Sequence, residues 1–261
     1  MRICISLILA MSHACLVAEP IVVRQTQGAT RGFLVIRSEE GKIIARGELN
    51  QVAHGERITT HLLYRFTDGS VDEDTVLYTQ RGTFRLISDH HTQRGPYFPK
   101  PIDYLVDATT GTITSRSLDK DGKEKIEVEH TTIPPDTYNG LVGTILVNSA
   151  PNASEFQIGM VAPTGKGRLI KLSIEPAGRG TVSIVGLAHT ANIFRVKVEL
   201  GGVAGVVAPI IGKKPADTMV WVLPGAAPGL VRQIGQLYNE GPIVSIEISG
   251  TSFQHSDRRA P

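Results

Sequence analysis

Hydrophobic and polar residues alternate along most of the chain, with the period of two that places successive side chains on opposite faces of a β-strand. The longest regular stretch covers residues 57–66, and an Asp-Gly turn at residues 68–69 follows it. Asp-Gly pairs favour hairpins because both residue types tolerate a positive φ. Further strands are predicted around these apolar positions: Val76–Tyr78, Phe84–Leu86, Ile102–Val106, Ile113, Ile126–Val128, Phe156–Met160, Ile170–Ile174, Phe194–Leu200, Met219–Leu223 and Val244–Ile248. The pattern predicts a mainly β protein with an antiparallel meander.

Residues 137–148 interrupt this pattern and predict one helix. Two prolines precede Asp136, a residue type whose carboxylate accepts hydrogen bonds from the first-turn amides. Apolar residues then recur at the spacing of one helix face: Tyr138, Leu141, Val142, Ile145 and Leu146. Because Gly140 and Gly143 lower the helix propensity, packing against the sheet must stabilise this helix.

The first 18 residues have the layout of a secretory signal peptide. Arg2 precedes an uncharged apolar run, and small residues lead up to Ala18. Cleavage after Ala18 would remove both cysteines of the chain, Cys4 and Cys15, and with them any disulfide or thiolate chemistry. Cleavage after Ala14 would instead leave Cys15 first, as in a bacterial lipoprotein. Both alternatives predict an exported protein, in the periplasm or outside the cell.

The rest of the chain is expected to form one domain. Residues 19–250 predict a single β-rich domain, with a subdivision near residue 150 as the alternative. Residues 251–261 are polar and predict a disordered tail. The formal net charge is +2, and no dense Lys/Arg stripe is present, which argues against a nucleic-acid partner.

The sequence lacks the common signatures of catalytic and metal sites. It contains no HExxH zinc motif, no Gly-x-Ser-x-Gly nucleophile elbow and no strand-to-helix GxGxxG loop. The acidic cluster Val71–Thr75 lacks the calcium-loop pattern and is expected to be a solvated strand start. We therefore expect no catalytic residue, no cofactor and no metal, and we leave open whether the protein is an enzyme.

The adjacent residues His90 and His91, with Asp89 before them, still resemble part of a metal or catalytic site. If the alternation of Phe84 and Leu86 continues, His90 lies on their face of the strand, and Asp89 and His91 lie on the opposite face. Since neighbouring side chains point apart, one metal ion could not easily bind both rings.

Asp89 and His91 could still share a metal or catalytic site. A third ligand would have to come from another strand, such as His61 or His130. We expect that no such third ligand meets them, and keep a metal-assisted hydrolase using Asp89 and His91 as an alternative.

Two long segments, Phe84–Arg116 and Val198–Ile248, resemble an uncharacterised bacterial exported protein family. The resemblance covers most of the chain after residue 18. At the level of fold, a long meander with a wrapping helix is similar to the LolA-like half-barrels, which are periplasmic carriers of lipoproteins and lipids. This resemblance implies a large, curved antiparallel sheet, a half-barrel, around one helix near residues 137–148.

The resemblance also implies a non-enzymatic binding protein for a lipid, a lipidated partner or another apolar ligand. The aromatic residues predicted to line the groove are Tyr64, Phe66, Tyr78, Phe84 and Trp221. The apolar stretch Gly201–Gly212 is expected to be a buried connection or a flap over that groove. A structural β interaction module is a further alternative, and association with an envelope membrane and the oligomeric state stay open. A continuous apolar cavity above roughly 300 Å³ would favour the carrier.

Overall fold

The computed structural model describes residues 20–119, 121–149, 154–162, 167–184, 186–199, 215–249 and 251–252. The expected signal peptide and the apolar stretch Gly201–Gly212 lie outside the described residues. So does most of the expected disordered tail, of which Thr251 and Ser252 pair with the main sheet as a short strand.

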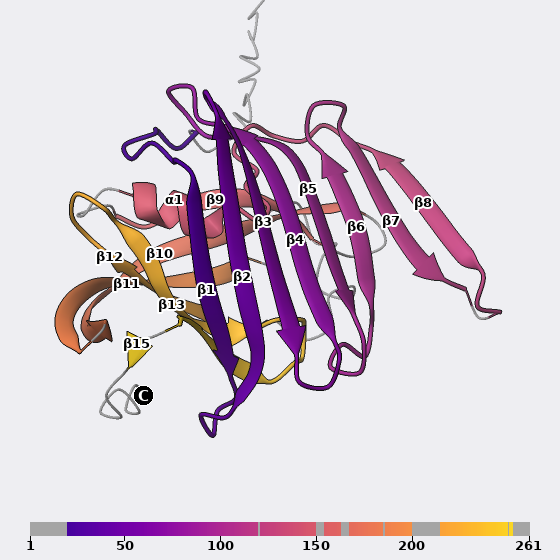
Figure 1. The fold of residues 1–261 in the computed structure, drawn as a ribbon. Helices are drawn as coiled ribbons and strands as arrows, with labels where there is room; N and C mark the ends of the chain where they lie inside the picture. The colour runs from indigo at the N-terminus through magenta and orange to yellow at the C-terminus, as the bar shows by residue number, and fades with distance from the viewer. Residues whose placement is uncertain are drawn as a thin grey trace, which may run out of the picture.

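Eight strands form the first layer of the fold, each antiparallel to the next (Figure 1). They are β1 (Thr30–Arg37), β2 (Ile43–His54), β3 (Arg57–Phe66), β4 (Val71–Thr79), β5 (Arg85–Arg94), β6 (Ile102–Asp107), β7 (Thr112–Leu118) and β8 (Glu124–His130). Tight turns with glycine at positive φ join several of them; Gly69, for example, has a φ of 90° between β3 and β4. The predicted meander is confirmed.

The remaining strands form a second layer that continues the same sheet, because β14 pairs with β1. They are β9 (Phe156–Ala162), β10 (Arg168–Ile184), β11 (Leu187–Glu199), β12 (Thr218–Leu223), β13 (Gly229–Gln236), β14 (Ile243–Ile248) and β15 (Thr251–Ser252). Within the described residues the strand order runs β15-β10-β11-β12-β13-β14-β1 and on to β8, with β9 paired beside β10. Among the described strands β8 pairs with β7 alone, and the curved sheet is not closed.

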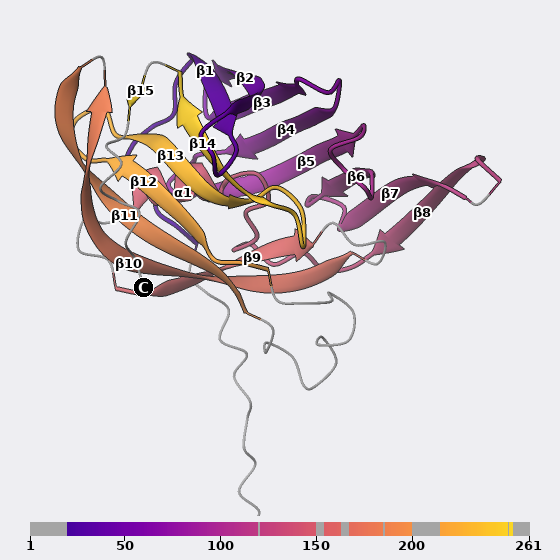
Figure 2. The same cartoon turned by 90° about the horizontal axis from the view of Figure 1, so that it is seen from below.

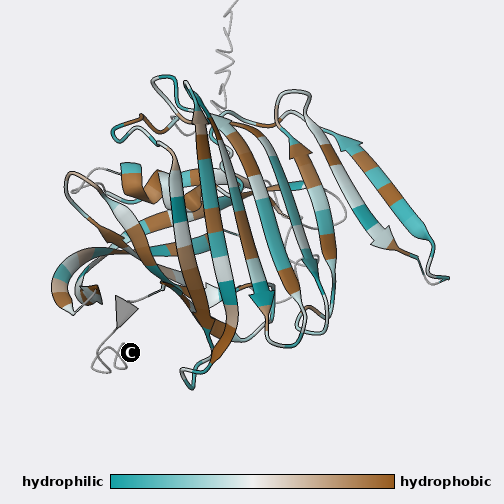
Figure 3. Ribbon diagram, viewed as in Figure 1, coloured by the Kyte–Doolittle hydropathy of each residue, from teal (hydrophilic) through white to brown (hydrophobic). Residues whose placement is uncertain are grey.

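Figure 2 shows the two layers from below, with the long strands β10 and β11 curving around one side and α1 between the layers. Figure 3 shows the sequence alternation as bands of hydrophobic and hydrophilic residues along the strands of the first layer. The predicted fold class, a large curved antiparallel sheet around one helix, is confirmed.

The helix is shorter than predicted. Helix α1 covers Val142–Asn148, and the chain before it is a turn rather than a first helical turn. Gly140 has a φ of 64°, a left-handed conformation that a helix does not contain. Tyr138 instead donates its backbone N–H to the carbonyl of Gly159 in β9. No helix in the described part of the chain has the length and hydropathy that a membrane span requires.

Asp136 does not cap the helix as predicted. Its fully buried carboxylate forms an ion pair with Lys171 of β10, with Oδ2 and Nζ 2.6 Å apart. Because β10 belongs to the second layer, this ion pair holds the segment before α1 against that layer. The apolar residues assigned to the helix face are nevertheless buried, and Tyr138, Leu141, Ile145 and Leu146 pack in the largest core cluster.

A β-bulge in β5 changes which side chains face the interior. Leu77 of β4 pairs with Ser88, whereas the next residue, Tyr78, pairs with Leu86, so Ile87 is the extra residue. Leu86 and Asp89 are therefore both buried on the inner face. The predicted placement of His90 on the face of Leu86 is wrong, because alternation does not continue through the bulge.

Candidate functional site

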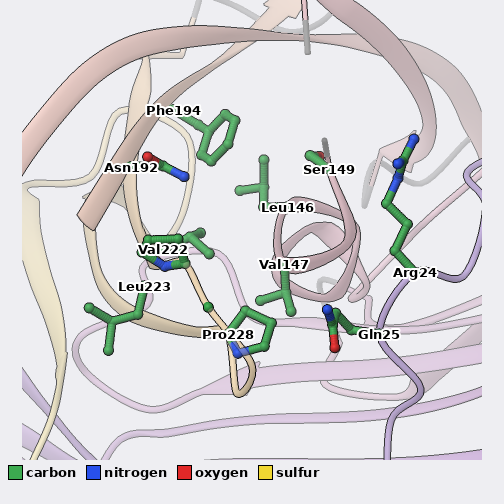
Figure 4. Close-up of a pocket in the computed structure, with 12 residues that line it drawn as sticks. Arg24, Gln25, Leu146, Val147, Ser149, Asn192, Phe194, Val222, Leu223 and Pro228 are labelled. Carbon is green, nitrogen blue, oxygen red and sulfur yellow. The ribbon is translucent and has the colours of Figure 1, made fainter. Parts of the chain in front are cut away.

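A cavity of about 120 Å³ lies between α1, β11 and the end of β12 (Figure 4). The N-terminal segment and the β12–β13 turn complete its wall. The lining residues are Arg24, Gln25, Leu146, Val147, Ser149, Asn192, Phe194, Val222, Leu223, Pro224, Gly225 and Pro228. Side chains from four separate parts of the sequence therefore meet at this cavity.

The wall of the cavity is mostly apolar. Figure 4 shows Leu146 and Val147 projecting from α1, with Phe194 and Val222 on the strands across from them. Asn192 adds an amide to the strand side of this wall. The arrangement suits an apolar group, with a small number of polar groups to orient it.

Asn148 holds the N-terminal segment against the end of α1. Its fully buried side-chain oxygen accepts hydrogen bonds from the backbone N–H groups of Arg24, at 2.9 Å, and Gln25, at 2.7 Å. Its amide nitrogen donates to the carbonyl oxygen of Thr144 at 3.0 Å. One side chain thus fixes both the last turn of the helix and the segment that forms one side of the cavity.

The cavity is small for a ligand site. Its volume of about 120 Å³ is below the roughly 300 Å³ of typical small-molecule pockets. It is close to the roughly 150 Å³ of an engineered apolar cavity that binds benzene. It can accept a group such as the end of an acyl chain, but not a whole lipid.

The five aromatic residues predicted to line a groove are all buried, but they do not lie together. Tyr78 and Phe84 pack in the large core cluster around α1. Tyr64 and Phe66 belong to a second cluster. Trp221 belongs to a third cluster. The lining of the 120 Å³ cavity contains none of the five.

A second feature of the interior is a polar cluster on β4 and β5. Asp72 and Asp74 of β4 lie beside Asp89 and His91 of β5, since Asp74 pairs with His91 and Val76 with Asp89 in the register. Asp89 is only 1% exposed. Buried carboxylates are costly unless they are paired or protonated, so this cluster requires an explanation.

Asp72 and His91 form an ion pair at the edge of this cluster. Their Oδ1 and Nε2 atoms are 2.7 Å apart. The other carboxylate oxygen of Asp72 accepts a hydrogen bond at 3.0 Å from the buried amide of Gln93, which also donates to the carbonyl of Leu237. Burial alone would lower the pKa of His91, but the hydrogen bond and charge of Asp72 raise it above its usual value.

Asp74 and Asp89 form a carboxyl pair deeper in the cluster. Burial, followed by the charge and hydrogen bond of Asp89, raises the pKa of Asp74 to about 9. Burial also raises the pKa of Asp89. Neither Oδ1 atom has a donor among the described side chains and backbone groups, and two carboxyls can hydrogen-bond each other only if one is protonated. The pair therefore shares a proton at neutral pH.

The loop before α1 closes over this carboxyl pair. Tyr104 donates a hydrogen bond of 3.4 Å from its hydroxyl to Oδ2 of Asp89, and Asn139 donates to that hydroxyl. Gly140 lies so close to the pair that a Cβ at this position would clash with Val76 and reach within 3.0 Å of Oδ2 of Asp74. The carboxyl pair is thus covered by backbone, and its neighbours leave little space for a substrate.

The histidines proposed as a third ligand are elsewhere. His61 pairs with Glu73, and His130 contacts Thr112. His90 pairs with Asp103 on the outer face. No group of three His, Cys, Asp or Glu side chains in the described ranges is placed to hold a metal ion. His91 contacts Asp72, and Asp89 contacts Tyr104.

The sequence interpretation missed the buried position of Asp72 and Asp74. Both were assigned to a solvated strand start, and this prediction is wrong because Asp72 is only 7% exposed and an oxygen of Asp74 is fully buried. The signal was present in their spacing, because both share the parity of Val76 and Tyr78, the inward residues of β4.

Comparisons with protein-family models and with curated proteins find no match. Among solved structures, the chain is similar to a beta-barrel-like protein of domain of unknown function DUF1849 from Brucella abortus, with 7% identity and a TM-score of 0.47. That match covers 87% of this chain and 98% of the other. A "putative lipoprotein" from Parabacteroides distasonis is 9% identical, with a TM-score of 0.34 and coverage of 90% and 100%. Likeness at this level assigns neither a family nor a function to the chain.

Proposed function

We propose that the protein is a non-enzymatic binding protein that holds the end of an acyl chain, from a lipid or a lipidated partner, between α1 and β11–β12. The observation that carries this proposal is the apolar cavity formed by Leu146, Val147, Phe194 and Val222. A methyl-terminated chain would gain free energy by leaving water for this wall, in proportion to the apolar area that it buries.

Helix α1 is short and weakly capped, and this supports entry of more of an acyl chain than its terminal group. The helix has only seven residues and no side-chain hydrogen bond at its N-cap. Gly140 precedes it and Gly143 lies in its first turn, and such short helices depend on packing rather than on their own stability. A shift of α1 away from β11 and β12 would lengthen the cavity along the helix, while Asn148 keeps the N-terminal segment attached.

The polar residues of the lining would orient the ligand. Arg24 and Gln25 come from the N-terminal segment, and Ser149 from the end of α1. A guanidinium and an amide near an apolar cavity suit a carboxylate or phosphate attached to an acyl chain. We place this activity in the periplasm or outside the cell, on the basis of the predicted signal peptide, with a lipoprotein anchored through Cys15 as the alternative.

Binding of a fluorescent fatty acid to the purified protein tests this function. The substitution Val147→Phe fills the cavity and should weaken saturable binding at least about tenfold. Val142→Phe introduces the same side chain into the same helix outside the lining and should leave the affinity within about threefold of the original. Absence of saturable binding, or equal binding by both variants, contradicts the proposal.

A second candidate function is hydrolysis by general acid–base catalysis. The observation that favours it is the carboxyl pair Asp74–Asp89 next to the ion pair of His91 and Asp72, because raised pKa values cluster at catalytic sites. In this scheme the protonated carboxyl of the pair is the acid, its ionised partner is the base, and His91 positions Asp72 beside them. Ester and glycoside hydrolysis by the protein, lost in both Asp89→Asn and His91→Gln while thermal unfolding is retained, would support it. Hydrolysis that persists in these variants, or is absent from the unsubstituted protein, would exclude it.

A further inference from the structure

Strand β8 is an open edge of the sheet with an unusual surface. Figure 2 shows β7 and β8 extending beyond the second layer, and in the part of the chain that the structure describes β8 pairs with β7 on one side only. Its second row of backbone N–H and C=O groups therefore faces outward. Exposed edges of this kind bind other strands unless charges, bulges or prolines prevent it.

Apolar side chains follow this edge on the outer face of the sheet. Ile126 and Val128 of β8 are each 53% exposed, and Leu118 of β7 is 73% exposed. The register explains their direction: Ile113, which is buried, pairs with Glu129, so Ile126 and Val128 point to the opposite face. Three large apolar side chains thus form a stripe that the first layer itself does not cover.

The sequence of β8, Glu-Lys-Ile-Glu-Val-Glu-His, is complementary to itself in the antiparallel direction. When two copies pair about Glu127, Lys125 of each copy faces Glu129 of the other, and Glu124 faces His130. Ile126 faces Val128 in the same alignment. Opposite charges and apolar residues directly across an antiparallel pair stabilise it.

We propose that β8 pairs antiparallel with β8 of a second copy of this chain, centred on Glu127, so that the sheets of the two copies continue into each other. The pairing is a twofold interface in which the same strand serves both partners. The stripe of Ile126, Val128 and Leu118 then continues across the junction on the outer face, and the edge no longer offers free backbone groups.

The proposed register is the one that pairs all seven residues of β8, since Glu127 is the middle residue of Glu124–His130. A shift of the centre to Val128 would place Glu127 against Glu129, and a shift to Ile126 would leave Lys125 as the partner of Glu127 but Glu124 against Val128. In the proposed register the one like-charge pair is Glu127 with its own copy. In each chain Lys125 is 2.7 Å from Oε1 of Glu127, and this ion pair reduces that repulsion.

Sedimentation velocity over about 1–200 μM tests the interface, because a contact of one strand from each copy is small and predicts micromolar dissociation. The unsubstituted protein should form dimers over this range. Lys125→Glu and Glu129→Lys each place like charges opposite each other twice per dimer, and each should weaken dimerisation about tenfold. The double variant restores opposite charges and should return to within about threefold of the original.

Two further variants separate the interface from changes in folding. Glu127→Gln removes the central like-charge pair and should tighten the dimer. Val128→Lys should abolish it, whereas Val52→Lys, which replaces a valine of similar exposure (48%) on β2, should not. A protein that stays monomeric at all concentrations overturns the proposal, and so does a dimer that the single charge changes do not weaken or the double change does not restore.

Discussion

Two regions of the interior differ in what they offer a ligand. The cavity beside α1 has space and a mostly apolar wall, formed by residues such as Val147 and Phe194. The cluster of Asp72, Asp74 and Asp89 has titratable groups, but the loop at Gly140 packs directly on them. Both regions lie between the two layers of the same sheet.

The two regions differ in the free-energy cost that each carries and in what offsets that cost. An empty apolar cavity costs free energy in lost packing, which a bound apolar group recovers. A buried carboxyl pair costs free energy in desolvation, which a shared proton and nearby hydrogen bonds reduce. We infer that ligand binding uses the first region, while the second fixes the loop that leads into α1.

The largest effect on stability expected from a single substitution concerns the close contact over the carboxyl pair. Gly140→Ala places a Cβ against Val76 and requires a left-handed conformation, so we expect a loss of about 3 kcal/mol in unfolding free energy. Gly143→Ala is the matched control, because its Cβ would approach Leu230 only to 3.2 Å. It should change stability by less than about 1 kcal/mol, since alanine also favours the helix. Urea unfolding of both variants measures the difference, and equal effects would show that Gly140 is not specially constrained.

The next effect is a dependence of stability on pH. The pKa of Asp74 is raised from 3.8 to about 9 in the folded protein, which therefore keeps a proton that the unfolded chain releases. This stabilisation is complete below about pH 4 and is lost as the pH rises toward about 9. The raised pKa of His91 also makes the unfolding free energy fall with rising pH, starting at the pKa of His91 in the unfolded chain. The unfolding free energy should fall by about 1.4 kcal/mol per pH unit near neutrality.

Two substitutions test this source of the pH dependence. Asp74→Asn removes the titrating carboxyl and should flatten the profile of unfolding free energy from about pH 5 to about pH 8. Asp103→Asn removes the partner of His90 on the outer face, where both side chains are more than a third exposed, and should leave the profile unchanged. A steep profile that persists in Asp74→Asn would show that this proton lies elsewhere.

The smallest expected effect concerns the cavity. Val147→Phe should raise the unfolding free energy by about 1 kcal/mol, because the larger ring fills space that the folded protein leaves empty. Val142→Phe, which adds the same ring outside the cavity, should lower it instead. Thermal unfolding of the two variants compares them, and destabilisation by both would mean that the wall around Val147 is already closely packed.

The strands from β3 to β8 were predictable because their side chains alternate and their turns contain glycine, whereas β1, β2 and β13 were not among the predicted strands. The extra residue Ile87 was not predictable, because a bulge depends on pairing with β4 rather than on its own sequence. The extended pairing of β10 with β11 was missed for a similar reason: residues 175–193 include a proline, glycines and charges that indicate loops in isolation. Pairing between long neighbouring strands stabilises them despite these residues.

The candidate site was less predictable than the fold. Strand alternation predicts that the five aromatic residues point inward, but inward aromatic residues can equally be core residues, and the five are divided among three core clusters. The cavity instead uses Val147, Val222 and residues of the N-terminal segment, which meet only through tertiary packing. No local pattern identifies such a set.

Photo-crosslinking with a fatty acid that carries a diazirine near its methyl end, followed by peptide mass spectrometry, tests the central claim most directly. Adducts are expected at Leu146, Val147, Phe194 or Val222, and an excess of unlabelled fatty acid should suppress them. Adducts confined to the inner face of β4–β6 or to the edge at β8, or no competed adduct at all, would contradict binding beside α1.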